Sequence, residues 1–167
     1  MKTLYLIRHA KSAWDSTASS DFDRPLNERG RSDAPRMAAF LRAQQIVPDQ
    51  IVSSSAIRAN TTARLIARGL DQDESSVMLD RRIYLADVHQ LQSILREFPD
   101  SWQSVMVIGH NPTLTDCANA LTGDVLNSLP TCSVYGIRLA IDSWLKLRNG
   151  VGERILYQVP KELTESP

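Results

Sequence analysis

Short apolar runs alternate with amphipathic segments along most of the chain. Leu4–Ile7 and Val105–Ile108 are uninterrupted apolar runs of strand length, a pattern typical of strands covered on both faces of a sheet. Further strands are expected over residues 50–53, 77–79, 133–141, 144–147 and 154–159. Helices are expected from residue 28 to about 41, and over 57–70, 88–98 and 112–121. This alternation predicts an α/β fold.

Turn and cap residues refine this pattern. Asn27 can cap the first helix, but Pro35 lies within it, so a kink or a restart near Pro35 is expected. Asn149-Gly150 is a strong hairpin signal between the strands expected over 144–147 and 154–159. The polar stretch Lys11–Arg24 reads as a long loop, and such loops in compact domains often carry function.

The predicted architecture is a three-layer α/β/α sandwich with a mainly parallel central sheet and a C-terminal β-hairpin. A chain of 167 residues is long enough for one domain with a sizeable core. We expect that domain to span residues 1–160, followed by a polar tail over residues 161–167.

Charge and cysteine content narrow the function classes. Nineteen basic and 19 acidic side chains give a formal net charge of zero, so no global field favours nucleic acid or a membrane surface. Cys117 and Cys132 are too few for a disulfide framework and are expected to be small buried apolar residues. No apolar run reaches membrane-spanning length, and the expected location is the cytoplasm.

Two histidines follow the two most apolar strands. Arg8-His9 comes directly after the first, and His110 follows the strand at 105–108, while Arg58 comes soon after the strand at 50–53. Ligands of open α/β sheets bind at such carboxyl ends. Arginine forks match phosphate or carboxylate oxygens, a neutral histidine nitrogen is a nucleophile, and a second histidine, when protonated, is a short-range cation. Together these residues describe an anion pocket containing a nucleophile, with no spacing typical of a zinc site.

Each of these residues taken alone has a simpler interpretation. Arg8-His9 could be an ordinary polar pair in a loop, and His110 could only form the turn into the next helix. Arg58 could be a solvated helix residue, the usual fate of arginine. His89 has no comparable setting and is expected on the surface. Only the combination is specific.

Four ordered segments resemble the signature motifs of the histidine phosphatase superfamily, which includes the phosphoglycerate mutases. They read LIRHAKS at 6–12, PLNERG at 25–30, SSSAIRANTTA at 53–63 and VIGHNP at 107–112. The Arg-His-Ala-Lys-Ser form is similar to the small branch related to the phosphohistidine phosphatase SixA. Lys11, Asp15 and Ser55 differ from the residues that many members carry at or near these places.

The resemblance implies a role for each matching residue. His9 matches the nucleophile that accepts a phosphoryl group, and Arg8, Arg58 and His110 match the groups that hold the phosphoryl oxygens. Fixed donors around those oxygens lower the barrier to transfer without a metal. No metal or other cofactor is therefore expected, and nearby arginines help to keep His9 neutral.

A general acid is harder to place. Phosphoglycerate mutase-like members carry a Glu shortly before a Tyr, and matching that Tyr to Tyr84 puts Arg81 at the acid's position. Asp80, one residue away, is the first candidate. The remaining candidates share only a place on loops: Asp21, Asp23 and Asp87.

This gap bears on the substrate. An alkoxide leaving group needs a proton donor, whereas the leaving nitrogen of phosphohistidine can already carry a proton. Arg58 and His110 are only 52 positions apart, which leaves little room for a lid over the pocket. The sequence thus favours phosphohistidine on a partner protein as substrate. The alternatives are a small-molecule phosphomonoesterase using Asp80 or a loop Asp, a less favoured mutase, and a phosphate- or phosphoprotein-binding module without turnover.

Overall fold

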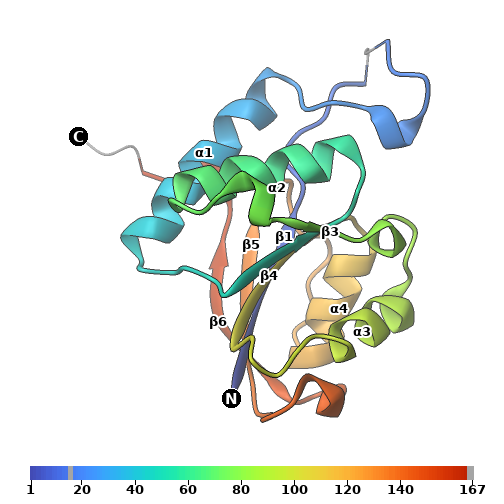
Figure 1. The fold of residues 1–167 in the computed structure, drawn as a ribbon, viewed down its shortest axis with the longest axis vertical. Coiled ribbons are helices and arrows are strands. Elements are labelled where there is room, and N and C mark those ends of the chain that lie inside the picture. Colours follow the sequence, from blue (N-terminus) through green and yellow to red (C-terminus); the bar gives the residue numbers. More distant parts are fainter. Residues whose placement is uncertain (15–16, 165–167) are drawn as a thin grey trace.

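In the computed structural model, residues 1–14 and 17–164 are described. Asp15, noted above as a departure from the family pattern, lies outside these residues. The described chain folds into a central sheet with helices on both faces (Figure 1). Within the described ranges, no helix combines the length and apolar character needed to cross a bilayer.

The described strands form a six-stranded sheet in the order β3-β2-β4-β1-β5-β6. Their bounds are β1 Lys2–Arg8, β2 Gln50–Ser53, β3 Met78–Leu79, β4 Ser104–Gly109, β5 Val134–Leu139 and β6 Gly152–Gln158. The pairs β1–β4, β4–β2 and β2–β3 are parallel. β5 and β6 run antiparallel and form the C-terminal hairpin. The predicted fold class is confirmed.

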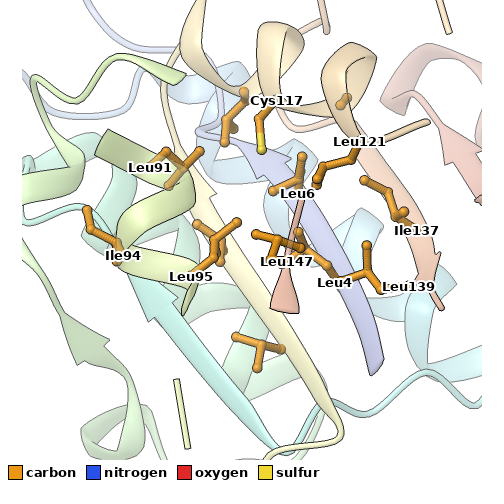
Figure 2. Close-up of a cluster of buried hydrophobic side chains, with 14 of the residues drawn as sticks. Leu4, Leu6, Leu91, Ile94, Leu95, Cys117, Leu121, Ile137, Leu139 and Leu147 are labelled. Carbon is orange, nitrogen blue, oxygen red and sulfur yellow. The ribbon is translucent and has the colours of Figure 1, made fainter. Parts of the chain in front are cut away.

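Helices cover both faces of the sheet, which therefore has two separate cores. α1 (Glu28–Ala43) and α2 (Ile57–Gly69) pack on one face, and α3 (Val88–Arg96) and α4 (Thr113–Thr122) on the other. Figure 2 shows the second core, in which Leu4 and Leu6 of β1 meet Leu91 of α3 and Leu121 of α4. Alternate β1 residues, Tyr5 and Ile7, point into the first core. Burial on both faces explains why β1 and β4 are uninterrupted apolar runs.

Five short 3-10 helices complete the described structure. They span Asp21–Asp23, Glu74–Ser76, Arg81–Ile83, Trp144–Lys146 and Pro160–Glu162. The strand predicted over 144–147 is thus wrong. Trp144 and Leu147 are buried while Leu145 is 75% exposed, a spacing of three that suits 3.0 residues per turn and not the alternation of a strand.

The hairpin and the first helix also differ in detail from the sequence prediction. β6 pairs with β5, and Asn149-Gly150 forms a turn within the longer connection between them, with Gly150 at φ +81°. α1 runs through Pro35 as one helix and does not restart there. Pro35 lies on the exposed face of α1, where water can satisfy the carbonyl left without its partner N–H.

Candidate active site

The sheet topology brings the two strand-end histidines together. β1 and β4 are adjacent and parallel, with Arg8 opposite Gly109. The next residues, His9 and His110, therefore leave the sheet at the same edge, and the His9 N–H donates to the Gly109 carbonyl at 3.1 Å. The centroids of the two imidazole rings are 5.2 Å apart. The predicted meeting of the two strand tips is confirmed.

A backbone carbonyl fixes the tautomer of His9. Its Nδ1 lies 2.7 Å from the Ala10 carbonyl oxygen, and because a carbonyl only accepts, Nδ1 carries the proton. Nε2 therefore presents a lone pair, and the Arg58 Nε–H points at it across 3.4 Å. Burial lowers the pKa of His9 to about 4, with the charges of Arg58, Arg8 and Arg24 acting in the same direction against the Ala10 hydrogen bond. At neutral pH His9 is therefore a neutral imidazole, and its Nε2 lone pair, which faces Arg58, has the chemistry of a nucleophile.

A serine sets His110 in the opposite orientation. The Ser54 hydroxyl accepts the Ala56 N–H at 3.2 Å and lies 2.8 Å from His110 Nε2. We assign the Ser54 hydroxyl as the donor to Nε2, which places the His110 proton on Nδ1, the ring nitrogen without a protein partner among the described residues. Burial, followed by the His9 and Arg58 charges, lowers the pKa of His110 to about 3. His110 is thus a neutral donor and not the cation considered from the sequence.

Two donor atoms at the site have no protein acceptor. Arg8 donates from Nη1 to the Leu129 carbonyl at 2.9 Å. The Nε of Arg8 is buried without a hydrogen-bond partner among the described residues, and so is the Nδ1 of His110. Unpaired buried donors cost free energy unless a ligand satisfies them. This chemistry fits an oxyanion bound beside His9.

Arg58 and Thr62 connect the first turn of α2 to His9 and Ala10. Thr62 Oγ donates to the Arg58 carbonyl at 2.7 Å and accepts the Ala10 N–H at 3.0 Å. The two residues are one helical turn apart, so both face β1. The sequence motif contains Thr62, but only the fold shows that it fixes the segment after His9.

The candidate acids occupy different places. Asp80 caps the 3-10 helix Arg81–Ile83 and pairs with Arg82 at 2.7 Å, which holds the pKa of its carboxyl below the ordinary value. Asp87 caps α3, and Asp23 accepts the hydroxyls of Ser19 and Ser20. Asp21 instead contacts Arg58 directly. A hydrogen bond from Tyr84, together with those from Arg58 and Arg24, lowers the pKa of Asp21 to about 2, although desolvation by burial acts in the opposite direction. Of these carboxylates, Asp21 and not Asp80 therefore contacts Arg58, whose Nε–H points at His9.

Comparison with known proteins shows which family shares this sequence and fold. The family model of the histidine phosphatase superfamily (branch 1) matches residues 4–104. An uncharacterised chloroplast protein of Arabidopsis thaliana is 30% identical over 152 residues, covering 86% of this chain and 69% of its own. A crystal structure from Agrobacterium tumefaciens, assigned to the phosphohistidine phosphatase SixA, superposes with a TM-score of 0.80 at 28% identity, covering 95% and 98% of the two chains. The structure of the protein histidine phosphatase SixA in complex with tungstate superposes with a TM-score of 0.83 at 24% identity, covering 97% of this chain and 99% of its own.

Proposed function

The chain belongs to the histidine phosphatase superfamily and is a phosphohydrolase similar to its SixA branch, and we propose that it removes phosphate from phosphohistidine on a partner protein through a covalent intermediate on His9. The observation that carries the proposal is the His9 Nε2 lone pair, set beside the Arg58 Nε–H at 3.4 Å. A module that only binds phosphate has no need of a neutral, oriented histidine nitrogen.

The reaction has two transfers at one nitrogen. His9 Nε2 attacks phosphorus, the bond from phosphorus to the substrate imidazole breaks, and that imidazole leaves with the electron pair. Water then attacks the phosphoryl group on His9, phosphate departs, and Nε2 regains its lone pair. Negative charge on the phosphoryl oxygens is met by the guanidinium groups of Arg8 and Arg58 and by the Nδ1–H of His110. No step needs a metal, because these fixed donors stabilise the transition state.

The state of the carboxylates favours a nitrogen leaving group. Asp21 is held as a carboxylate by Tyr84, Arg58 and Arg24, and Asp80 is paired with Arg82. Neither carries a proton to give to a departing alkoxide. When the second ring nitrogen of the substrate phosphohistidine is protonated, the departing group is a neutral imidazole, which needs no such donor.

The connection between α2 and β4 also fits a protein substrate. Its described elements are two 3-10 helices, β3 and α3, and none forms a domain over the strand tips. The solved SixA complex holds tungstate, a tetrahedral oxyanion like phosphate. The pocket is therefore proposed to take a phosphorylated side chain from a protein surface.

A turnover comparison tests the proposal. We expect a phosphohistidine protein to be the best substrate, para-nitrophenyl phosphate to react modestly, and sugar phosphates to react far more slowly. Arg58→Ala and His110→Ala are each expected to lower kcat about a hundredfold to a thousandfold, the usual loss of one preorganised donor. Chelators are expected to have no effect. Asp80→Asn and Asp87→Asn serve as controls and should leave phosphohistidine turnover almost intact.

The alternatives make different predictions in the same assay. A small-molecule phosphomonoesterase would prefer sugar phosphates and would lose that activity in Asp80→Asn. A binding module would retain phosphate but turn over none of the three substrates.

A further inference from the structure

One carboxylate connects three segments around the site. Asp21 Oδ2 accepts from Arg58 Nη2 at 3.0 Å and from the Tyr84 hydroxyl at 2.5 Å. Its Oδ1 accepts from Arg24 Nε at 3.0 Å, and its backbone carbonyl accepts from Arg58 Nη1 at 2.7 Å. Asp21 thereby joins the 3-10 helix after β1 to the first turn of α2 and to the segment after β3.

Arg58 depends on this contact. Its side chain is only 7% exposed, and among the described residues its ion pair is with Asp21 alone. A buried guanidinium without a counter-ion is costly. Both terminal nitrogens of Arg58 are bound to Asp21 while Nε points at His9. The two hydrogen bonds from Nη1 and Nη2 to Asp21 therefore fix the plane of the Arg58 guanidinium.

We infer that Asp21 is a positioning residue: it orients the Arg58 guanidinium so that its Nε–H and remaining N–H groups face a phosphoryl group on His9. The inference rests on the proposed function of His9. A guanidinium has five N–H donors, and Asp21 engages two of them, which leaves the Nε–H and two others for a phosphoryl group on His9. Asp21 acts on the reaction through Arg58 and contributes no proton.

Tyr84 strengthens the same arrangement. Its hydroxyl binds Asp21, and its ring packs edge-on against Phe22 at 4.9 Å and His110 at 5.4 Å between centroids. The ring contacts are independent of the hydroxyl. Tyr84→Phe therefore removes the support for the Asp21 carboxylate and keeps the packing around His110.

Steady-state kinetics of Asp21→Asn test the inference. We expect kcat on a phosphohistidine protein and on para-nitrophenyl phosphate to fall about tenfold to a hundredfold, the cost of a misplaced catalytic group, while KM changes less than about threefold. Tyr84→Phe should show a smaller loss in the same parameter. Asp23→Asn is the matched control, because Asp23 shares the 3-10 helix but its carboxylate accepts the hydroxyls of Ser19 and Ser20. Its kcat should stay within about twofold of the parent.

A double-mutant cycle separates positioning from acid catalysis. If Asp21 acts through Arg58, Asp21→Asn has almost no further effect in the Arg58→Ala protein. An undiminished loss in that background, or a loss confined to poor leaving groups, would overturn the inference. Vanadate affinity provides a readout that needs no turnover: it should fall in Asp21→Asn and not in Asp23→Asn. Unchanged vanadate affinity in Asp21→Asn contradicts the role of Asp21, whereas absent turnover by the parent protein contradicts the proposed function.

Discussion

Two histidines of similar burial receive different tasks from one hydrogen bond each. The Ala10 carbonyl holds the proton of His9 on Nδ1 and leaves Nε2 with the lone pair that the proposed nucleophile requires. The Ser54 hydroxyl contacts Nε2 of His110, which assigns Nδ1 as the proposed donor. The difference between the two proposed roles therefore lies in the neighbouring oxygen and not in the imidazole itself.

Ser54→Ala tests the assignment of His110. Without the hydroxyl, Nε2 loses its partner and the proton is no longer held on Nδ1, so we expect kcat to fall about tenfold to a hundredfold. Ser55→Ala is the adjacent control and should leave kcat within about twofold. Circular dichroism would verify that both variants are folded. Equal activity of Ser54→Ala and the parent would show that Ser54 does not orient His110.

The protonation of His9 can be measured directly. Its pKa of about 4 means that the imidazole stays neutral from pH 8 down to about pH 5. Nitrogen-15 NMR of labelled histidine side chains should show His9 Nε2 unprotonated over this range, with the signal assigned by its loss in His9→Asn. Titration of His9 near pH 6.5 would contradict the account of its burial and its arginine neighbours.

At the residue scale, the sequence identified the four side chains at the centre of the candidate site but did not single out Asp21, which contacts Arg58. Arg8, His9, Arg58 and His110 are recognisable because each lies in a motif beside a strand or helix start. Asp21 was one of several loop carboxylates, since a loop without periodicity gives no sign of which side chain turns inward. Its contact with Arg58 joins residues 37 apart in sequence and exists only in the folded chain.

At the scale of elements, the Pro25–Gly30 motif holds the segment that follows His9. The Asn27 N–H donates to the Lys11 carbonyl at 2.9 Å, and the Asn27 side chain caps α1 at Gly30 N. The Ala13 N–H donates to the Pro25 carbonyl at 2.9 Å. This motif is structural: it packs the start of α1 against the backbone just after His9.

Gly30→Ala tests that role. A Cβ at Gly30 would lie 2.2 Å from the Lys11 carbonyl oxygen, so the backbone after His9 must move. We expect a destabilisation of about 1–3 kcal/mol, typical of overpacking, together with a fall in kcat. Urea denaturation and turnover would measure the two effects, and Ser32→Ala, at an exposed position of α1, is the control. Parent-like stability and kcat would show that the close approach is dispensable.

Most elements followed from hydrophobic periodicity, and the exception has a physical cause. β1 and β4 were predicted because strands buried on both faces contain continuous apolar runs. The segment Trp144–Leu147 was also predicted to be a strand, yet it contains Lys146 and forms a 3-10 turn that inserts Trp144 and Leu147 into the core. Three apolar side chains within four residues do not distinguish a strand from a 3-10 turn, because packing in the core that they share with α3 decides between the two.

At the scale of the whole molecule, two buried uncharged histidines make the stability of the fold dependent on pH. Their pKa values of about 4 and about 3 lie below the ordinary 6.5, so the unfolded chain binds their protons more readily. The free energy of unfolding should therefore fall as the pH drops below about 6.5, on the order of 2 kcal/mol per histidine by pH 5.

Urea denaturation at pH 7, 6 and 5 would measure this loss. The double variant His9→Asn, His110→Asn should show a much smaller decrease over the same interval, because it lacks both groups. A parent protein whose stability is constant from pH 7 to pH 5 would contradict the burial of neutral imidazoles.

The most direct test of the central claim is to trap the phosphorylated enzyme. The protein would be mixed with a phosphohistidine protein or para-nitrophenyl phosphate, quenched rapidly in alkali, and analysed by peptide mass spectrometry. We expect an acid-labile, alkali-stable phosphate on His9 that is absent from His9→Ala. That variant should be inactive while still binding vanadate weakly through Arg8 and Arg58. Turnover by His9→Ala near the parent rate, or a phosphoenzyme labelled at another residue, would contradict the central claim.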